Sequence, residues 1–354
     1  MSKPLITWQF LYNSLQQKIP AMLLYVLQSE GSSPGRQGFF MGVNSLGQMS
    51  GSIGGGIMEH KFVEMAKARL REQGSRYKVQ GSRFRELDSS DKSEGSSGAE
   101  TVTSHESEKA IIKKQVHDKS AAENQSGMIC SGEQTILLYP ITEGDEFTIL
   151  NIINSTANHQ NGTLVLSPLG IEFIDSQPAK DFEFKITSEQ SWTYKEKTGY
   201  KNQLYIVGGG HCALALSQLM RQMDFYVRLF EERSQLNTLE QNKYVHQKTV
   251  VESYSELSDL IPQGANQYVV IMTVGYRTDY LALKALLVQD FKYVGVLGSR
   301  KKMEKLLTDL EAENVDPKKL YQVYTPVGIT INSHTPEEIA VSIAAEIIMV
   351  KNQK

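Results

Sequence analysis

The chain has little cysteine, no long apolar run and no excess of basic charge, and each shortage excludes a class of protein. Only two cysteines occur in 354 residues, so a disulfide framework is excluded and a reducing, cytoplasmic setting is expected. Lysine and arginine number 37 against 40 acidic residues, which leaves no basic stripe for nucleic acid. Without an apolar run of membrane-spanning length or a signal-peptide pattern, no membrane association is expected.

The length predicts two domains, which we place at residues 1–198 and 199–354. From about residue 88 to 126 the composition shifts to Ser, Glu, Lys, Gly and Ala, so this polar insertion is expected to be mobile, with at most a short helix. No spacing of cysteine and histidine fits a structural metal site, so no metal ligands are predicted.

The first 80 residues combine helix and strand patterns, which predicts an α+β domain. Trp8, Leu11 and Leu15 keep helical spacing, and residues 21–27 form an apolar run typical of a buried strand. A second helix is predicted from about Met58, ending before Gly74 as its C′ residue.

A glycine motif in the second half is the strongest signal of the sequence. Residues 204–207 form a short strand pattern that leads into Gly208, Gly210 and Ala213, the spacing of a nucleotide-binding turn. Gly208 allows a sharp turn, Gly210 has no Cβ to block a phosphate, and Ala213 lets the helix pack closely. This predicts a Rossmann-like, doubly wound parallel sheet whose helix N–H groups face an anion.

The segments after this turn agree with that fold. Residues 225–230 read as the second strand and end at Glu231, an acid about twenty positions on, where a ribose hydroxyl would be bound. The runs 268–272 and 293–297 are typical of central parallel strands. Thr335 and Glu338 predict a capping box for the last helix. The fold alone does not establish nucleotide binding.

Two further helix starts are candidate anion sites. Gly298, Ser299 and Arg300 open a helix whose first turn holds three cations, which oppose the helix dipole. They either contact a phosphate-like anion or form a solvated basic face. In the first domain, Gly54, Gly55 and Gly56 lead into a helix. That turn either receives an anion or serves close backbone packing.

Three reactive side chains have an ordinary alternative role. Cys130 lies between the polar segment and a predicted strand. Its side chain is either buried as a small hydrophobic residue or exposed with an accessible sulfur. Cys212 is expected to pack beneath the helix after the glycine turn. His211 either caps that helix or contacts a bound anion. Glu59 and His60 are adjacent and cannot share one helical face as an acid–base couple.

Taken together, separated blocks of the chain resemble the XdhC/CoxI family of xanthine dehydrogenase accessory factors, which has relatives serving carbon monoxide dehydrogenase. The blocks are residues 31–34 with 54–59, 128–132, 208–211, 298–300, and 326–329 with 335–340. Each motif is modest alone, but their joint order is specific. The resemblance implies an N-terminal domain of the XdhC/CoxI type before the Rossmann-like domain.

The resemblance also implies a function. Such a protein binds molybdenum cofactor (molybdopterin) and assists its sulfuration and insertion into a xanthine dehydrogenase-type molybdenum hydroxylase, with a cysteine desulfurase as a further partner. It gives Cys130 a role near the molybdenum or in sulfur handling. It makes the pterin and its phosphate the candidate ligands of the other site residues, namely Gly54, Gly55, Gly56, Glu59, Gly208, Gly210, His211, Glu231, Gly298, Ser299 and Arg300. A homodimer is expected.

The sequence departs from the family at three places and leaves alternatives open. Cys212 stands where Val is usual. Ser131 stands where Gly is usual, and Val274 stands where a His commonly follows Thr273, which weakens any claim of proton transfer there. A chaperone is therefore expected rather than an enzyme. The alternatives are an NAD(P)-dependent oxidoreductase, favoured by the glycine turn and Glu231, and a regulatory protein that uses the Rossmann fold only structurally.

Overall fold

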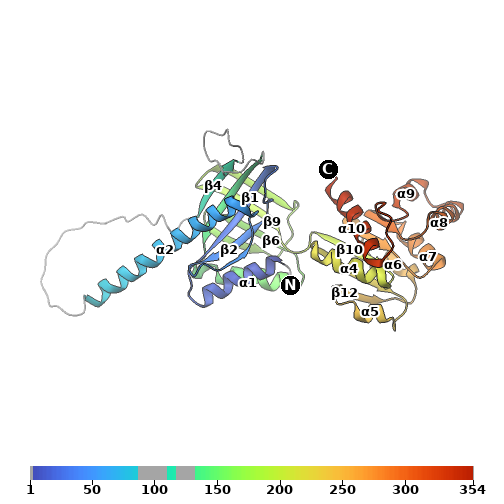
Figure 1. Cartoon of the computed structure of the whole chain (residues 1–354), viewed down its shortest axis with the longest axis horizontal. Helices are drawn as coiled ribbons and strands as arrows, with labels where there is room; N and C mark the ends of the chain where they lie inside the picture. Colours follow the sequence, from blue (N-terminus) through green and yellow to red (C-terminus); the bar gives the residue numbers. More distant parts are fainter. Residues whose placement is uncertain (1–2, 87–109, 117–131, 354) are drawn as a thin grey trace. The chain divides into compact units, whose positions relative to one another are not determined.

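The computed structural model describes residues 3–86, 110–116 and 132–353, and it divides into two compact units (Figure 1). The first unit is Met1–Gly199 and the second is Tyr200–Lys354. The first unit contains two antiparallel sheets, whereas the second contains one parallel sheet. Among the described helices, none is long and apolar enough to cross a membrane.

The first sheet of the N-terminal unit has five antiparallel strands in the order β3-β2-β1-β5-β4. Its centre is β1 (Ala21–Gly31), between β2 (Phe40–Asn44) and β5 (Gly132–Pro140). The edge strands are β3 (Met49–Gly51) and β4 (Ile111–Val116). Residues 21–27 thus form the buried strand that their apolar run predicts.

Side chains of β1 alternate between two hydrophobic cores, because successive residues of a strand point to opposite faces. The side chains on the same face of β1 as Leu24 pack against helix α2 (Gly56–Glu86). The side chains on the opposite face of β1, which includes Leu23, pack against helix α1 (Lys3–Gln16), helix α3 (Glu146–Ala157) and the second sheet. The central sheet therefore lies between two covering layers (Figure 1).

The second sheet has the order β7-β6-β9-β8 and is joined to the first by a partly buried polar contact. Tyr25 of β1 and Tyr194 donate their hydroxyl protons to Oε2 of Glu196, at 2.6 and 2.7 Å. Burial and then the Glu196 charge hold the pKa of Tyr25 well above its ordinary value. The strands are β6 (Thr163–Ser167), β7 (Gly170–Ile174), β8 (Phe182–Ser188) and β9 (Ser191–Lys197).

Two predictions for this unit were wrong. Residues 111–116 lie in the stretch expected to hold at most a short helix, but they form β4, in register with β5 from Ile111 opposite Leu138. Strand pairing with β5 decided this outcome rather than local composition. Helix α2 does not end before Gly74 but continues to Glu86. A single glycine costs a helix about 1 kcal/mol, which is too little to terminate it by itself.

The C-terminal unit contains six parallel strands in the order β12-β11-β10-β13-β14-β15. In chain order this is 3-2-1-4-5-6, so the direction of winding reverses between β10 and β13. The predicted doubly wound sheet is confirmed. The strands are β10 (Asn202–Val207), β11 (Phe225–Glu231), β12 (Gln247–Val250), β13 (Gly264–Ile271), β14 (Phe291–Val296) and β15 (Val323–Tyr324).

Helices cover both faces of this sheet. On one face α4 (His211–Gln222) packs with α10 (Pro336–Asn352), and on the other α7 (Tyr276–Leu286) lies beside α8 (Arg300–Ala312) (Figure 1). Each central strand of the sheet supplies apolar residues to both cores, which explains its continuous apolar runs. Short helical segments complete the chain, namely η2 (Glu143–Asp145), α5 (Asn237–Gln241), η3 (Tyr254–Glu256), α6 (Leu257–Leu260) and α9 (Pro317–Tyr321).

The capping box of α10 is present as predicted and provides a test of this fold. The Thr335 hydroxyl accepts from Glu338 N and the Glu338 carboxylate accepts from Thr335 N, each at 3.2 Å. We expect Thr335→Ala to lower the free energy of unfolding by about 1 kcal/mol, because one helix-end N–H loses its acceptor. Denaturant unfolding measures this loss. The exposed Thr330→Ala is the control, and equal stability of the two variants would contradict the role of the cap.

Candidate functional site

The glycine turn after β10 lies against the end of the neighbouring strand β13. Gly208 has a φ of +103°, and a Cβ at this position would lie 2.4 Å from the Met272 carbonyl oxygen. Its N–H donates to the Phe230 carbonyl at 2.8 Å. Gly208 is therefore required by the close approach of two backbones at the point where winding reverses.

Two helices, α4 and α7, begin at the carboxyl ends of the neighbouring strands β10 and β13, and their N-termini are open. Gly210 is the N-cap of α4 and Gly275 is the N-cap of α7, and neither supplies a side-chain hydrogen bond to the helix. A Cβ added at either glycine meets no atom of the described chain within 4 Å. Both helix starts thus have open space at the N-cap glycine, and the positive ends of the helix dipoles favour an anion there.

His211 is the first residue of α4 and is exposed. Because the N-cap position belongs to Gly210, His211 is not the cap of its helix. Its other predicted role, contact with an anion, stays a prediction.

Glu231 ends β11 beside the glycine turn, but its carboxylate bonds to the chain itself. Oε2 accepts from Gly209 N at 2.7 Å, and both oxygens accept from the Arg233 guanidinium at 2.9 Å. The side chain is only 1% exposed. Burial acts to raise the pKa of Glu231, but the bonds from Arg233 and Gly209 outweigh it and hold the pKa below its ordinary value. A ribose would have to displace these bonds.

The start of α8 is closed, in contrast to α4 and α7. The Ser299 hydroxyl is the N-cap acceptor for Lys302 N at 3.4 Å, and a Cβ at Gly298 would lie 2.6 Å from the Met303 methyl carbon. The Lys302 ammonium forms an ion pair with the fully buried Asp279. Asp279 thus compensates one of the three cations that oppose the dipole. Contact of Ser299 and Arg300 with a phosphate stays a prediction.

The glycine turn of the N-terminal unit is filled by the chain's own acid. Oε2 of Glu59 accepts from Ile53 N at 2.9 Å, Gly55 N at 3.0 Å and the Ser52 hydroxyl at 2.7 Å. A Cβ at Gly54 would lie 2.4 Å from Gly35 N. Close backbone packing, one of the two interpretations of this turn, is therefore present. Glu59 stands where an external anion would bind.

The φ angles of this turn explain its three consecutive glycines. Gly54, Gly55 and Gly56 have φ values of +130°, +76° and +70°, a backbone region that other residues rarely adopt. Binding of the pterin or its phosphate at these glycines and at Glu59 stays a prediction.

The two cysteines differ in what can be said of them. Cys130 lies outside the described residues, so its role stays a prediction. Cys212 is half-buried and packs against the core shared by α4 and α10, as expected. Burial and then the nearby Glu337 raise the pKa of its thiol, which disfavours a reactive thiolate there.

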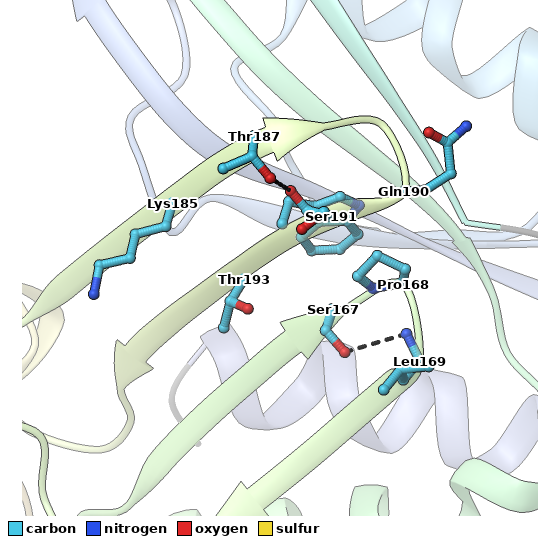
Figure 2. A pocket seen from close by; sticks show the side chains of 9 residues that line it. Ser167, Pro168, Leu169, Lys185, Thr187, Gln190, Ser191 and Thr193 are labelled. Atoms are coloured by element: carbon cyan, nitrogen blue, oxygen red, sulfur yellow. Dashed lines mark hydrogen bonds between the residues drawn. The ribbon is translucent and has the colours of Figure 1, made fainter.

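A hollow of about 370 Å³ in the N-terminal unit contains none of the predicted site residues. Figure 2 shows its lining, which comes from the β6–β7 and β8–β9 hairpins and carries mainly hydroxyl and amide groups with one cation, Lys185. A hollow of about 430 Å³ in the C-terminal unit lies along α7 and α8 and begins at Tyr276, next to Gly275. Among the described residues, no group of three or more His, Cys, Asp or Glu side chains could hold a metal ion.

Sequence reasoning missed the α7 start and its buried anchor. Gly275 follows an apolar strand just as Gly208 does, so position after a strand was the available signal. Asp279 belongs to no motif of the sequence, and an isolated Asp usually caps a helix or is solvated, but here it is 0% exposed. The unbalanced cations at the start of α8 pointed to a negative partner without identifying it.

One stretch in each unit of the chain matches an XdhC family model. Residues 204–347 match the XdhC Rossmann domain, and residues 14–80 match the XdhC and CoxI family.

Two curated proteins are similar to part of the chain. The chain is 29% identical to the uncharacterized protein YqeB of Escherichia coli strain K12, over 44% of this chain and 28% of that protein. It is 34% identical to a probable xanthine dehydrogenase component of Bacillus subtilis strain 168, over 24% of this chain and 23% of that protein. The alignments thus span less than a third of either curated relative.

A crystal structure of a xanthine dehydrogenase from Bacillus halodurans has the same fold. It superposes with a TM-score of 0.67 over 100% of this chain and 97% of that one, at 20% identity.

The two outer glycines of the C-terminal turn have separable roles. We expect Gly208→Ala to destabilise the protein by roughly 2 kcal/mol or more, because the added Cβ meets the Met272 carbonyl and a positive φ. Gly210 has a φ of −71° and open space at its Cβ position, so Gly210→Ala should cost only about 1 kcal/mol, the usual effect of alanine at an N-cap. Thermal unfolding measures both, and equal loss in the two variants would refute the distinction.

Proposed function

Because the chain belongs to the XdhC/CoxI family, we propose that it is an accessory protein for a xanthine dehydrogenase-type molybdenum hydroxylase. The names of the Bacillus subtilis and Bacillus halodurans relatives support the association with such an enzyme. The family models over both halves of the chain support the accessory role.

The finer proposal is that the protein binds molybdenum cofactor through its phosphate, at the open starts of α4 and α7. The observation that carries it is the pair of glycine N-caps, Gly210 and Gly275, each with open space where a Cβ would be. Main-chain N–H groups at helix starts suit a phosphate group.

The bound cofactor would supply the metal and its sulfur ligands, whereas this chain supplies binding and orientation. Main-chain N–H groups of α4 and α7 would hold the phosphate, with the exposed His211 and Arg300 at the rim. Cys130 would handle or protect the sulfur, in partnership with a cysteine desulfurase. Assistance in sulfuration and delivery to the enzyme completes this role.

The geometry supports this ligand more than a nicotinamide dinucleotide. In a dinucleotide site the acid after the second strand is bound by a ribose. Here Glu231 is buried and its carboxylate accepts from Gly209 and Arg233. A phosphate at the helix starts leaves those bonds in place, whereas a ribose at Glu231 breaks them.

Cofactor retention tests the proposed site. Protein purified anaerobically from a host that makes molybdenum cofactor should carry molybdenum and pterin in comparable amounts, measured by elemental analysis and by pterin fluorescence after oxidation. Gly210→Val fills the open space at the start of α4, so it should retain several-fold less of both. Saturable NAD(H) or NADP(H) binding with turnover, and no pterin, would instead establish the oxidoreductase.

A second test concerns sulfur chemistry. We expect Cys130→Ala to lower the retention of sulfurated cofactor, because the variant loses a soft ligand. Cys212→Ala is the matched control, since this thiol packs against the core and its pKa is raised. Equal retention by the two variants would remove Cys130 from the site.

A further inference from the structure

We infer that Asp279 is a positioning residue that holds the start of α7 in place for the anion, an inference that rests on the proposed function. Asp279 lies in the first turn of α7 and is 0% exposed. A carboxylate without exposure is costly unless its oxygens are bonded. Its partners therefore show what this charge accomplishes.

The carboxylate of Asp279 connects the loop between β13 and α7 to the start of α8, at the edge of the sheet where the anion is proposed to bind. Oδ1 accepts from Thr273 N at 3.1 Å and from the Thr273 hydroxyl at 2.5 Å, which fixes the loop between β13 and α7. Oδ2 pairs with the Lys302 ammonium in the first turn of α8. One buried group thus sets the loop that carries Gly275 relative to the next helix.

The same loop supports the glycine turn of α4. A Cβ at Gly208 would lie 2.9 Å from the Thr273 Cα, so this turn rests directly on the backbone that Asp279 fixes. Thr278 also donates its hydroxyl proton to the Gly275 carbonyl at 3.0 Å, which closes the first turn of α7. Displacement of Thr273 would therefore disturb both open helix starts.

Fold stability alone does not require this ion pair. Replacing a buried ion pair by apolar residues of similar size is often neutral or stabilising. Apolar side chains cannot, however, accept the two directional bonds from Thr273. The contribution specific to Asp279 is the geometry of the loop.

Two double variants separate the ion pair from the hydrogen-bond acceptor. Asp279→Asn with Lys302→Gln removes both charges but keeps an amide oxygen for Thr273. Asp279→Leu with Lys302→Met removes the charges and the acceptor. Hydrogen exchange of the Thr273 main-chain amide, which donates to Asp279, is measured on the full chain without ligand, together with thermal unfolding and the pterin retained per chain.

We expect the leucine and methionine variant to remain folded at the assay temperature but to unfold at a lower temperature, because two Thr273 donors lose their acceptor. It should exchange the Thr273 amide faster and retain about tenfold less pterin, the usual scale for losing an orienting group. The asparagine and glutamine variant should preserve slow exchange and retention. Equal exchange and equal retention in the two variants would overturn the positioning role. If the natural chain retains no pterin, the proposed function fails, and a difference in exchange still supports the positioning of the loop.

Discussion

The close approach of Gly208 to the Met272 carbonyl is the constraint on which the second unit depends. Strands β10 and β13 lie side by side, with Val207 opposite Ile271, and their chains leave in opposite directions around the sheet. The turn after β10 can lie this close to the Met272 carbonyl only because Gly208 has no side chain. This contact brings the starts of α4 and α7 to one edge, where the main chain can bind an anion.

Acidic side chains near the glycine turns are mostly used within the protein. Glu59 fills the turn before α2, Glu231 braces the turn before α4, and Asp279 fixes the loop before α7. The α8 start is closed by its own serine. The starts of α4 and α7 thus differ from those of α2 and α8 in having a glycine N-cap and no side-chain hydrogen bond to the helix start.

Local patterns predicted the elements that local chemistry determines. The apolar strand before Gly208 and the Thr335 capping box were read correctly, because turn geometry and helix capping depend on a few adjacent residues. Strand β4 was not predicted, since its pairing with β5 is a long-range contact. Asp279 is buried and pairs with Lys302, which lies 23 positions further along the chain. No local sequence motif encodes a contact of this length.

The Glu59 contacts have a consequence for how the first unit loses structure. This carboxylate belongs to the first turn of α2, yet it accepts from the N–H groups of Ile53 and Gly55 in the preceding loop. Fraying of the helix end would release the loop, and opening of the loop would leave a helix-borne charge without its donors. Loop and helix start should therefore open as a single cooperative segment, rather than peel apart residue by residue.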